Sequence, residues 1–146
     1  MKKILILCFI FLLVGCSYVD ENLEHHTSSN ISEEDLVKAL HENGVLVVET
    51  TSLKDDIFGS KLNQVKPGAY EVDDKQLFIY EYQTEDNRDK GLEQFNKNTE
   101  TMNVVSYSVF KHRNILMFYV HAEDLSATSI PYVKEINEAL KSFVEG

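Results

Sequence analysis

The sequence predicts an α+β domain in which helices pack against an antiparallel sheet of about five strands, in two layers and in the order α-β-β-β-α-β-β-α. Three observations lead to this class. Two pairs of β-rich segments are each joined by a short polar turn, which is typical of antiparallel hairpins. Three other segments have the capping residues or apolar spacing of helices. No internal repeat is visible, so we expect a single domain over residues 31–146.

The first helix is predicted to start at Ser32, a residue type that caps helix N-termini, and acidic residues follow it in the first turn. Ile31 and Leu36 have the spacing of a hydrophobic staple across that start. We expect the helix to end near Gly44, because glycine is favoured just after a helix. The β-branched segment 45–50 then predicts the first strand.

The two hairpins are predicted at residues 70–82, with a turn at 73–75, and at residues 104–120, with a turn at 112–114. The last strand of the second hairpin, 115–120 (ILMFYV), is apolar on both faces. We therefore expect it to lie centrally in the sheet, with other elements covering each side.

The remaining elements are one irregular segment and two helices. Residues 53–67 fit neither the helix nor the strand period, which indicates a long loop with a helical turn. Thr84 is predicted to cap a second helix, which Gly91 in its middle weakens. Apolar residues spaced along 133–144 predict a C-terminal amphipathic helix, with Pro131 near its first turn.

The first fifteen residues have the pattern of an export signal. Lys2 and Lys3 precede an unbroken apolar block of eleven residues, 4–14. A helix of that length covers about 17 Å, which is too short for a hydrocarbon core of about 30 Å. The block therefore predicts a signal peptide over residues 1–15 and not a permanent membrane span.

The apolar block ends with Leu13-Val14-Gly15-Cys16, which resembles the lipobox of bacterial lipoproteins. The resemblance implies that the Cys16 thiol receives a diacylglyceryl group and that the chain is cut before Cys16. It also implies that the lipid anchors the protein at the extracytoplasmic face of the cell membrane. No other cofactor is expected. Cys8 would be removed with the signal, so Cys16 is expected to be the single cysteine of the mature chain.

Residues 16–30 are predicted to form the lipidated cysteine and a flexible tether, because this stretch is polar and has no sustained periodicity. His25 and His26 lie within it. Neighbouring histidines in a polar run are more simply read as solvated side chains than as metal ligands.

The chain is strongly acidic, with a formal net charge of −10 at pH 7. Such a chain is repelled by the phosphate backbones of nucleic acids and by anionic lipid head groups. We therefore expect no nucleic-acid partner, and we assign membrane contact to the lipid and not to surface charge.

The sequence contains no glycine-rich nucleotide motif, no HExxH or CxxC metal motif and no GxSxG nucleophile elbow. The acidic pairs Asp55-Asp56 and Asp73-Asp74 lack the ligand spacing of a calcium loop and are read as surface turns. No catalytic residue and no metal site is predicted, and we expect the domain not to be an enzyme.

Two histidines near the second hairpin are further candidates for chemistry. His121 precedes Glu123 and Asp124 and could serve as a base, although a strand-end histidine beside solvated acids is the commoner arrangement. His112 is too far from His121 along a straight strand for the two to share a metal.

Tyrosines are the most suggestive set of side chains. Tyr80 and Tyr82 lie two residues apart on one predicted strand, so their side chains point to the same face. If exposed, the pair could stack on sugars or grip a peptide, which makes it the candidate recognition face. The alternative is an ordinary pair of half-buried sheet tyrosines, because tyrosine is a good strand residue.

The layout of a lipobox followed by one small domain, with stretches such as GLEQF and ILMFYV, resembles the small uncharacterised lipoproteins of Bacillus-like bacteria. The resemblance implies an address and no known activity. We expect a non-catalytic binding or interaction module of the cell envelope, with an envelope protein or a wall component as its partner. The alternatives are a small-ligand carrier, which needs a closed apolar pocket above the sheet, and a small envelope-acting enzyme, which needs a cleft with a buried histidine–carboxylate pair.

Overall fold

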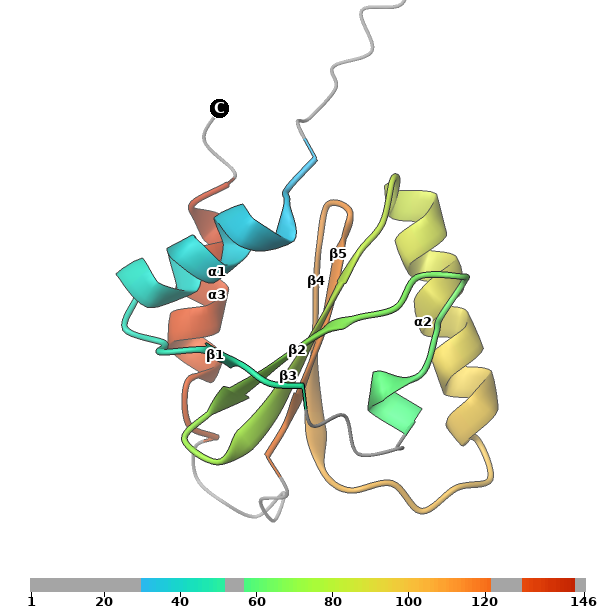
Figure 1. Cartoon of the computed structure of the whole chain (residues 1–146). Coiled ribbons are helices and arrows are strands. Elements are labelled where there is room, and N and C mark those ends of the chain that lie inside the picture. The colour runs from blue at the N-terminus through green and yellow to red at the C-terminus, as the bar shows by residue number, and fades with distance from the viewer. Residues whose placement is uncertain (1–29, 52–56, 122–129, 144–146) are drawn as a thin grey trace, which may run out of the picture.

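The computed structural model describes residues 30–51, 57–121 and 130–143, and Figure 1 shows their arrangement. In chain order the elements are α1 (Glu33–Glu42), β1 (Val48–Glu49), the 3-10 helix η1 (Ile57–Gly59), β2 (Gly68–Val72), β3 (Lys75–Glu81), α2 (Glu85–Thr99), β4 (Tyr107–His112), β5 (Ile115–Val120) and α3 (Val133–Lys141). The α+β class and the predicted order of helices and strands are confirmed.

The strands form one antiparallel sheet in the order β1-β2-β3-β5-β4. The hairpins β2–β3 and β4–β5 are joined at the middle of the sheet, where β3 pairs with β5. The turn of the first hairpin holds Asp73 and Asp74 at positive φ, as a two-residue turn between twisted strands requires. Both predicted hairpins are therefore present.

The first strand is shorter than the sequence predicts. The Val45 N–H donates to the Leu40 carbonyl at 2.9 Å, and a ring nitrogen of His41 lies 3.0 Å from the Val47 carbonyl oxygen. These bonds tie the chain leaving α1 back to that helix. β1 is then limited to Val48–Glu49, and the Thr50 N–H after it donates to the Ala69 carbonyl of β2 at 2.9 Å.

Helices cover both faces of the sheet, so the domain has three layers and not the two that we predicted (Figure 1). α1 and α3 lie together on one face, and α2 lies with η1 on the other. The reason is in the central strands: every residue of β5 is buried. A strand that is apolar on both faces has to be covered on both sides, as we expected for residues 115–120.

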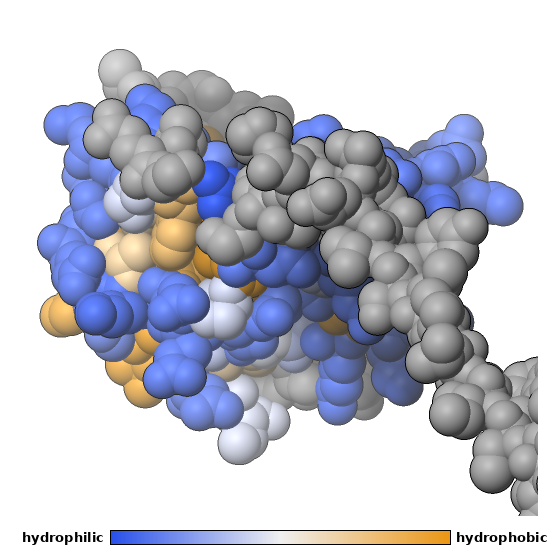
Figure 2. All heavy atoms as spheres, turned by 90° about the horizontal axis from the view of Figure 1, so that it is seen from above, coloured by the Kyte–Doolittle hydropathy of each residue, from blue (hydrophilic) through white to orange (hydrophobic). Residues whose placement is uncertain are grey.

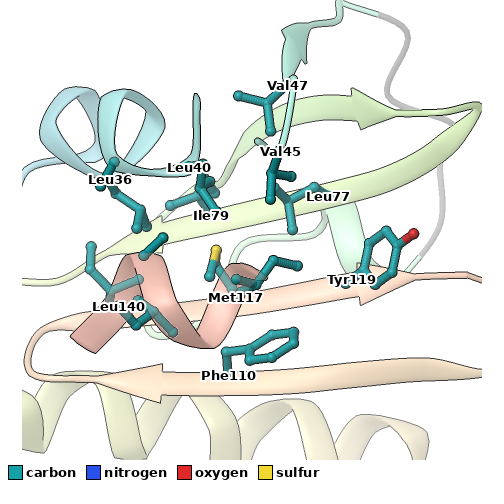
Figure 3. Close-up of a cluster of buried hydrophobic side chains, with 14 of the residues drawn as sticks. Leu36, Leu40, Val45, Val47, Leu77, Ile79, Phe110, Met117, Tyr119 and Leu140 are labelled. Atoms are coloured by element: carbon teal, nitrogen blue, oxygen red, sulfur yellow. The ribbon is translucent and has the colours of Figure 1, made fainter. Parts of the chain in front are cut away.

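The core beneath α1 and α3 is mainly aliphatic (Figure 3). Leu36 and Leu40 from α1 and Leu140 from α3 point toward Ile79 and Met117 of the two central strands. All of these side chains are buried. Each contributes roughly 1.5–3 kcal/mol relative to an exposed position, so this layer supplies a large part of the folding free energy.

The core beneath α2 is mainly aromatic. Phe95 of α2 lies with its ring centroid 4.3 Å from that of Phe118 in β5 and 5.4 Å from that of Phe58 in η1. Tyr107 meets both Phe58 and Phe95 edge-on, at 5.1 and 5.5 Å. Tilted and edge-on ring pairs of this kind add about 0.5–1.5 kcal/mol each beyond the area that they bury.

α1 begins as the sequence predicts. The Ser32 hydroxyl oxygen accepts the Asp35 N–H at 3.1 Å and donates to the Asp35 carboxylate at 2.6 Å. Ile31 and Leu36, the predicted staple pair, both lie in the aliphatic core. The helix ends at Glu42, and Asn43 is its C-cap. Gly44, which follows, has φ 81°.

α2 carries its glycine because another side chain approaches the helix closely. Thr84 caps the helix as predicted, accepting the Asn87 N–H at 3.2 Å. Gly91 is buried, and a Cβ placed on it would lie 2.1 Å from the Tyr82 hydroxyl oxygen. The glycine that we read only as a weakness of the helix is thus the position where the Tyr82 ring fits.

Asn114, at the turn between β4 and β5, fastens the start of the domain to the sheet. Its amide accepts the Ile31 N–H at 2.8 Å and donates to the carbonyls of Ile31 and Tyr82 at 2.9 and 3.0 Å. The side chain is buried, and Asn30 adds a bond to the Gln83 carbonyl beside it. Seen from this end, the molecule is largely hydrophilic, with apolar residues gathered on one side (Figure 2).

Candidate functional site

The predicted lipidation residue, Cys16, lies outside the described residues, as do His25 and His26 of the predicted tether. Within the described part of the chain, no helix combines the length and the apolar character needed to cross a membrane. The lipid anchor therefore stays a prediction from the sequence.

The predicted recognition face of Tyr80 and Tyr82 is not exposed. The two side chains do share one face of the sheet, with nearly parallel rings 6.2 Å apart, as their spacing indicated. However, Tyr80 is fully buried and Tyr82 is only 2% exposed. They lie under α2 and η1 and leave almost no surface for a sugar or a peptide to contact, so the prediction of an exposed face is wrong.

The tyrosine hydroxyls instead hold the irregular segment that follows β1. The Tyr80 hydroxyl lies 2.7 Å from the Phe58 carbonyl and 2.6 Å from the Ser60 carbonyl. The Tyr82 hydroxyl donates to the Leu62 carbonyl at 3.3 Å, and burial raises the pKa of Tyr82 to about 12. The described part of the predicted loop is therefore fastened to the sheet, and it contains the expected helical turn as η1.

His121 is buried and contacts a serine. Its Nε2 lies 3.3 Å from the Ser108 hydroxyl, and its N–H extends the β4–β5 ladder by donating to the Ser106 carbonyl at 3.2 Å. Glu123 and Asp124, the acids predicted beside it, lie outside the described residues. A serine–histidine contact can activate a nucleophile only where a substrate can reach the hydroxyl. Ser108 is partly exposed, whereas His121 is 0% exposed and its backbone N–H belongs to the β4–β5 ladder, so we read the pair as structural.

His112 lies at the opposite end of the same hairpin. It pairs with Ile115 next to the turn, whereas His121 follows the last residue of β5. Among the described residues, no group of three or more histidine, cysteine or acidic side chains is arranged to hold a metal ion. His112 has a different property: burial and the neighbouring Arg113 lower its pKa, and its buried Nε2 has no hydrogen-bond partner in the described structure.

A groove of about 430 Å³ lies on the surface where α1, β1 and β2 meet. Its lining combines apolar and acidic side chains: Glu33, Glu34, Val37, Val47, Glu49 and Tyr70. The three glutamates come from the first turn of α1 and from β1, and Tyr70 rises from β2 between them. Lysine and arginine are both missing from this lining, so its charge is negative.

Tyr70 and Glu33 are fixed against each other in this groove. The Tyr70 hydroxyl donates to Glu33 Oε1 at 2.6 Å. Partial burial, this hydrogen bond and the charges of Glu33 and Glu49 together raise the pKa of the Tyr70 hydroxyl far above its ordinary value. The hydroxyl therefore stays protonated and acts as a donor, and its bond holds the Glu33 side chain at one place in the groove.

Two backbone features bring Glu33 to this position. The Glu33 N–H donates to Glu81 Oε2 at 2.8 Å, which fixes the start of α1 over the end of β3. Gly68, the first residue of β2, leaves room for the Glu33 carboxylate, because a Cβ there would lie 1.7 Å from Oε1. The glycine thus permits the contact between α1 and β2.

A second groove, of about 410 Å³, lies beside the start of α2. Its lining is mostly amides and contains one carboxylate, from the residues Asn63, Gln64, Val65, Glu81, Tyr82, Gln83 and Asn87. Asn63 and Gln64 have positive φ in a tight turn between Leu62 and Val65. The Asn63 N–H and side chain bond to Gln94 and Asn87 of α2, so this turn is held to the helix.

Neither groove was predicted from the sequence. Glu33 and Glu34 were read as helix-start acids, which they also are, and Tyr70 as one strand tyrosine among several. The groove depends on α1 crossing the edge strands β1 and β2, and that crossing is set by the Asn114 bonds to Ile31, 83 residues away in sequence. The one local signal was the apolar alternation of Val45 and Val47.

Comparison with known proteins adds no relative: the chain matches no known family model, no curated protein and no solved structure. The class of this protein is therefore defined by its fold, a three-layer α+β domain with a central five-stranded antiparallel sheet, and by the groove on its α1 face.

Proposed function

We propose that this protein is a lipoprotein anchored at the extracytoplasmic face of the cell membrane, and that its domain is a non-catalytic binding module of the envelope. The anchor rests on Leu13-Val14-Gly15-Cys16 at the end of an apolar block too short to span a bilayer. A diacylglyceryl chain pair gives durable attachment, whereas a single acyl chain does not.

The groove between α1, β1 and β2 is the observation that carries the binding function. Its walls offer carboxylates from Glu33, Glu34 and Glu49 around the apolar side chains of Val37 and Val47. A ligand that matches both features is a cationic group on an apolar stem, such as a lysine side chain of an envelope protein or of a wall peptide. The stem would cover the valines while the ammonium group stays near the carboxylates and water.

The small-ligand carrier is the second candidate, and the structure favours it less. A carrier needs a closed apolar pocket above the sheet, and here the space above both faces is filled by the side chains of the two cores. The enzyme alternative needs a cleft that holds a buried histidine–carboxylate pair. His121 is buried and contacts the Ser108 hydroxyl, and the acids that follow it, Glu123 and Asp124, lie outside the described residues.

Acyl labelling tests the anchor. Cells expressing the full chain would be fed a labelled fatty acid, and Cys16→Ala would be compared with the matched variant Cys8→Ala. We expect Cys16→Ala to remain an unlabelled precursor, while Cys8→Ala is processed and labelled like the wild type. An acyl-labelled, processed Cys16→Ala protein would disprove the lipoprotein assignment.

A peptide pair tests the binding function independently of the anchor. A peptide alternating valine and lysine would be titrated against the full-length lipidated protein in nanodiscs, with its valine–glutamate counterpart as control. We expect binding only of the lysine peptide, weakened by added salt because the groove charges are near the surface. Glu34→Gln with Glu49→Gln should weaken it, and Glu93→Gln with Glu100→Gln, exposed on α2 and at its C-cap, should not. If both pairs of substitutions weakened binding of the lysine peptide equally, the assignment of the binding site to this groove would be contradicted.

A further inference from the structure

The second feature of the fold that can hold a partner is the free edge of the sheet at β4. β4 is six residues long and is the last strand of the sheet, and within the described structure it pairs with β5 alone. Natural sheets protect their edges with short strands, charges, prolines or bulges. The opposite edge strand, β1, is protected in this way because only two of its residues pair.

The hydrogen-bond register shows which groups of β4 face outward. His112 and Ile115 close the two-residue turn, and Ser106 and His121 exchange a ladder bond, so bonded pairs alternate along the hairpin. The residues between these pairs are Tyr107, Val109 and Lys111. Their N–H and C=O groups point away from β5, toward the open edge.

The large exposed side chains on and just before β4 are mainly apolar, and the acid beside them, Asp89 of α2, is paired with Lys111. Met102, Val105 and Val109 are 51%, 54% and 39% exposed, and three of the five large apolar side chains exposed on the described surface are therefore on or just before β4. The stretch 101–122 contains no aspartate or glutamate, although the whole chain has 24. Lys111 is half-exposed at the end of the edge, within 3.7 Å of Asp89.

We propose that β4 accepts an extended segment of another envelope protein as a sixth, antiparallel strand, and that this segment has apolar residues facing Val109 and a carboxylate near Lys111. The three outward residues would exchange about six backbone hydrogen bonds with such a strand. Apolar and acidic residues in alternation would complement an edge that has exposed valines and a lysine but no acid.

A second copy of this chain fits the edge less well. Two β4 strands that pair antiparallel place the two domains in opposite directions, so that the two Ile31 ends leave from opposite ends of the joined sheet. If both chains carry the lipid anchor proposed above, their two N-terminal segments must reach the same membrane from opposite ends of the joined sheet, which disfavours this pairing. A different protein is therefore the better occupant.

The test uses a synthetic peptide, Thr-Val-Glu-Val-Thr-Val, and a version N-methylated at alternate residues, which keeps the side chains but blocks one hydrogen-bonding edge. Both would be titrated against the full lipidated protein in nanodiscs. We expect the plain peptide to bind at least about tenfold more tightly, since several backbone bonds are lost in the other. Equal affinities, or no binding of the plain peptide, would overturn the proposal.

Protein variants locate the site. Val109→Pro removes an outward N–H without breaking the β4–β5 ladder, and edge strands tolerate proline there. We expect it to abolish peptide binding, whereas Val109→Thr keeps it and Lys111→Glu weakens it. If Val48→Pro abolished peptide binding and Val109→Pro did not, the added strand would lie on β1, and the proposal would be overturned. Sedimentation would also overturn the proposal if it showed a dimer of the wild type that is absent in Val109→Pro, because the added strand would then come from a second copy of this chain. The groove variants at Glu34 and Glu49 should leave this binding unchanged, so failure here and failure of the groove are distinguishable.

Discussion

The two faces of the sheet are held together in different ways. On the α1–α3 face, aliphatic side chains interdigitate between two helices and the strands, and no single residue dominates. On the α2 face, four phenylalanines and three tyrosines surround one helix and a loop, and tyrosine hydroxyls fix the loop backbone. The aliphatic face depends on many interchangeable contacts. The aromatic face depends on a few specific ones.

This difference explains how each face uses the surface above it. The helices α1 and α3 cover their face, and a groove lies where α1 crosses β1 and β2. The aromatic face is closed by a segment without regular structure, which has to be fastened by side chain to backbone bonds. Tyr80 and Tyr82, the pair predicted to form a recognition face, instead bind backbone carbonyls of this segment through their hydroxyls.

Core truncation should separate the two faces most strongly. Phe95→Ala removes a ring that contacts three others, one of them from η1, so we expect a loss of about 4–5 kcal/mol in unfolding free energy. Leu36→Ala, equally buried on the aliphatic face, should cost about 3 kcal/mol because its neighbours can relax around the gap. Urea unfolding measures both, and a larger loss for Leu36→Ala would contradict the comparison.

Asn114 joins the two faces at the tether end, and its loss should be nearly as costly. Asn114→Ala leaves the Ile31 N–H and the Ile31 and Tyr82 carbonyls without partners in a buried site. We expect a loss of about 3 kcal/mol, at roughly 1 kcal/mol for each unmade bond. Asn98→Ala, exposed on α2, is the control and should be neutral or slightly stabilising. Similar urea midpoints for the two variants would argue against the clamp.

Gly91→Ala tests the close approach on the aromatic face. Alanine favours a helix over glycine by about 1 kcal/mol, but here its Cβ would overlap the Tyr82 side chain. We expect a net loss of about 1–3 kcal/mol from overpacking. In a Tyr82→Phe background the nearest clashing atom is gone, so the loss should shrink. Thermal or urea unfolding of the four proteins gives the coupling, and additive effects would mean that Tyr82 is not the obstacle.

Tyr80→Phe should loosen only the loop. The change leaves the Phe58 and Ser60 carbonyls without the hydroxyl that binds them, at a cost of about 1–2 kcal/mol. Hydrogen exchange should become faster within residues 57–65 and stay unchanged in α1. Tyr107→Phe, in the same aromatic cluster, is the control. Faster exchange in both variants would show that ring packing and not the hydroxyl holds the loop.

His112 should give the smallest effect, and it depends on pH. Its folded-state pKa is lowered, first by burial and then by Arg113, so the unfolded chain binds the proton more readily. Stability from this group is therefore present above the unfolded pKa of about 6.5 and is lost as the pH falls below it. The stability of the wild type relative to His112→Gln should decrease between pH 7.5 and pH 5. A difference that is constant with pH would contradict this reading.

The sequence was sufficient to predict features that depend on neighbours in the chain. The caps at Ser32 and Thr84 and the two hairpins all follow from residue types within a few positions of one another. The two-sided burial of residues 115–120 also followed from their composition, and it should have led us to predict three layers. We placed all helices on one face although that strand required cover on both.

Features that depend on distant contacts could not be predicted. Whether Tyr80 and Tyr82 face solvent depends on where α2 and η1 lie, and a period-2 pattern is the same for a buried and an exposed strand face. The groove depends on the crossing of α1 over β2, which is set by Asn114 and made possible by Gly68. In one sequence, a single asparagine or a single glycine does not indicate that it sets a distant contact of this kind.

We propose that the groove between α1, β1 and β2 is the binding surface of an anchored module. Hydrogen exchange of the full lipidated protein in nanodiscs, with and without the valine–lysine peptide, tests it most directly. We predict slower exchange in the first turn of α1, in residues 47–50 and in β2, and no change in α2. Slowing confined to α2 or to β4, or no slowing at peptide concentrations that saturate binding, would contradict the claim.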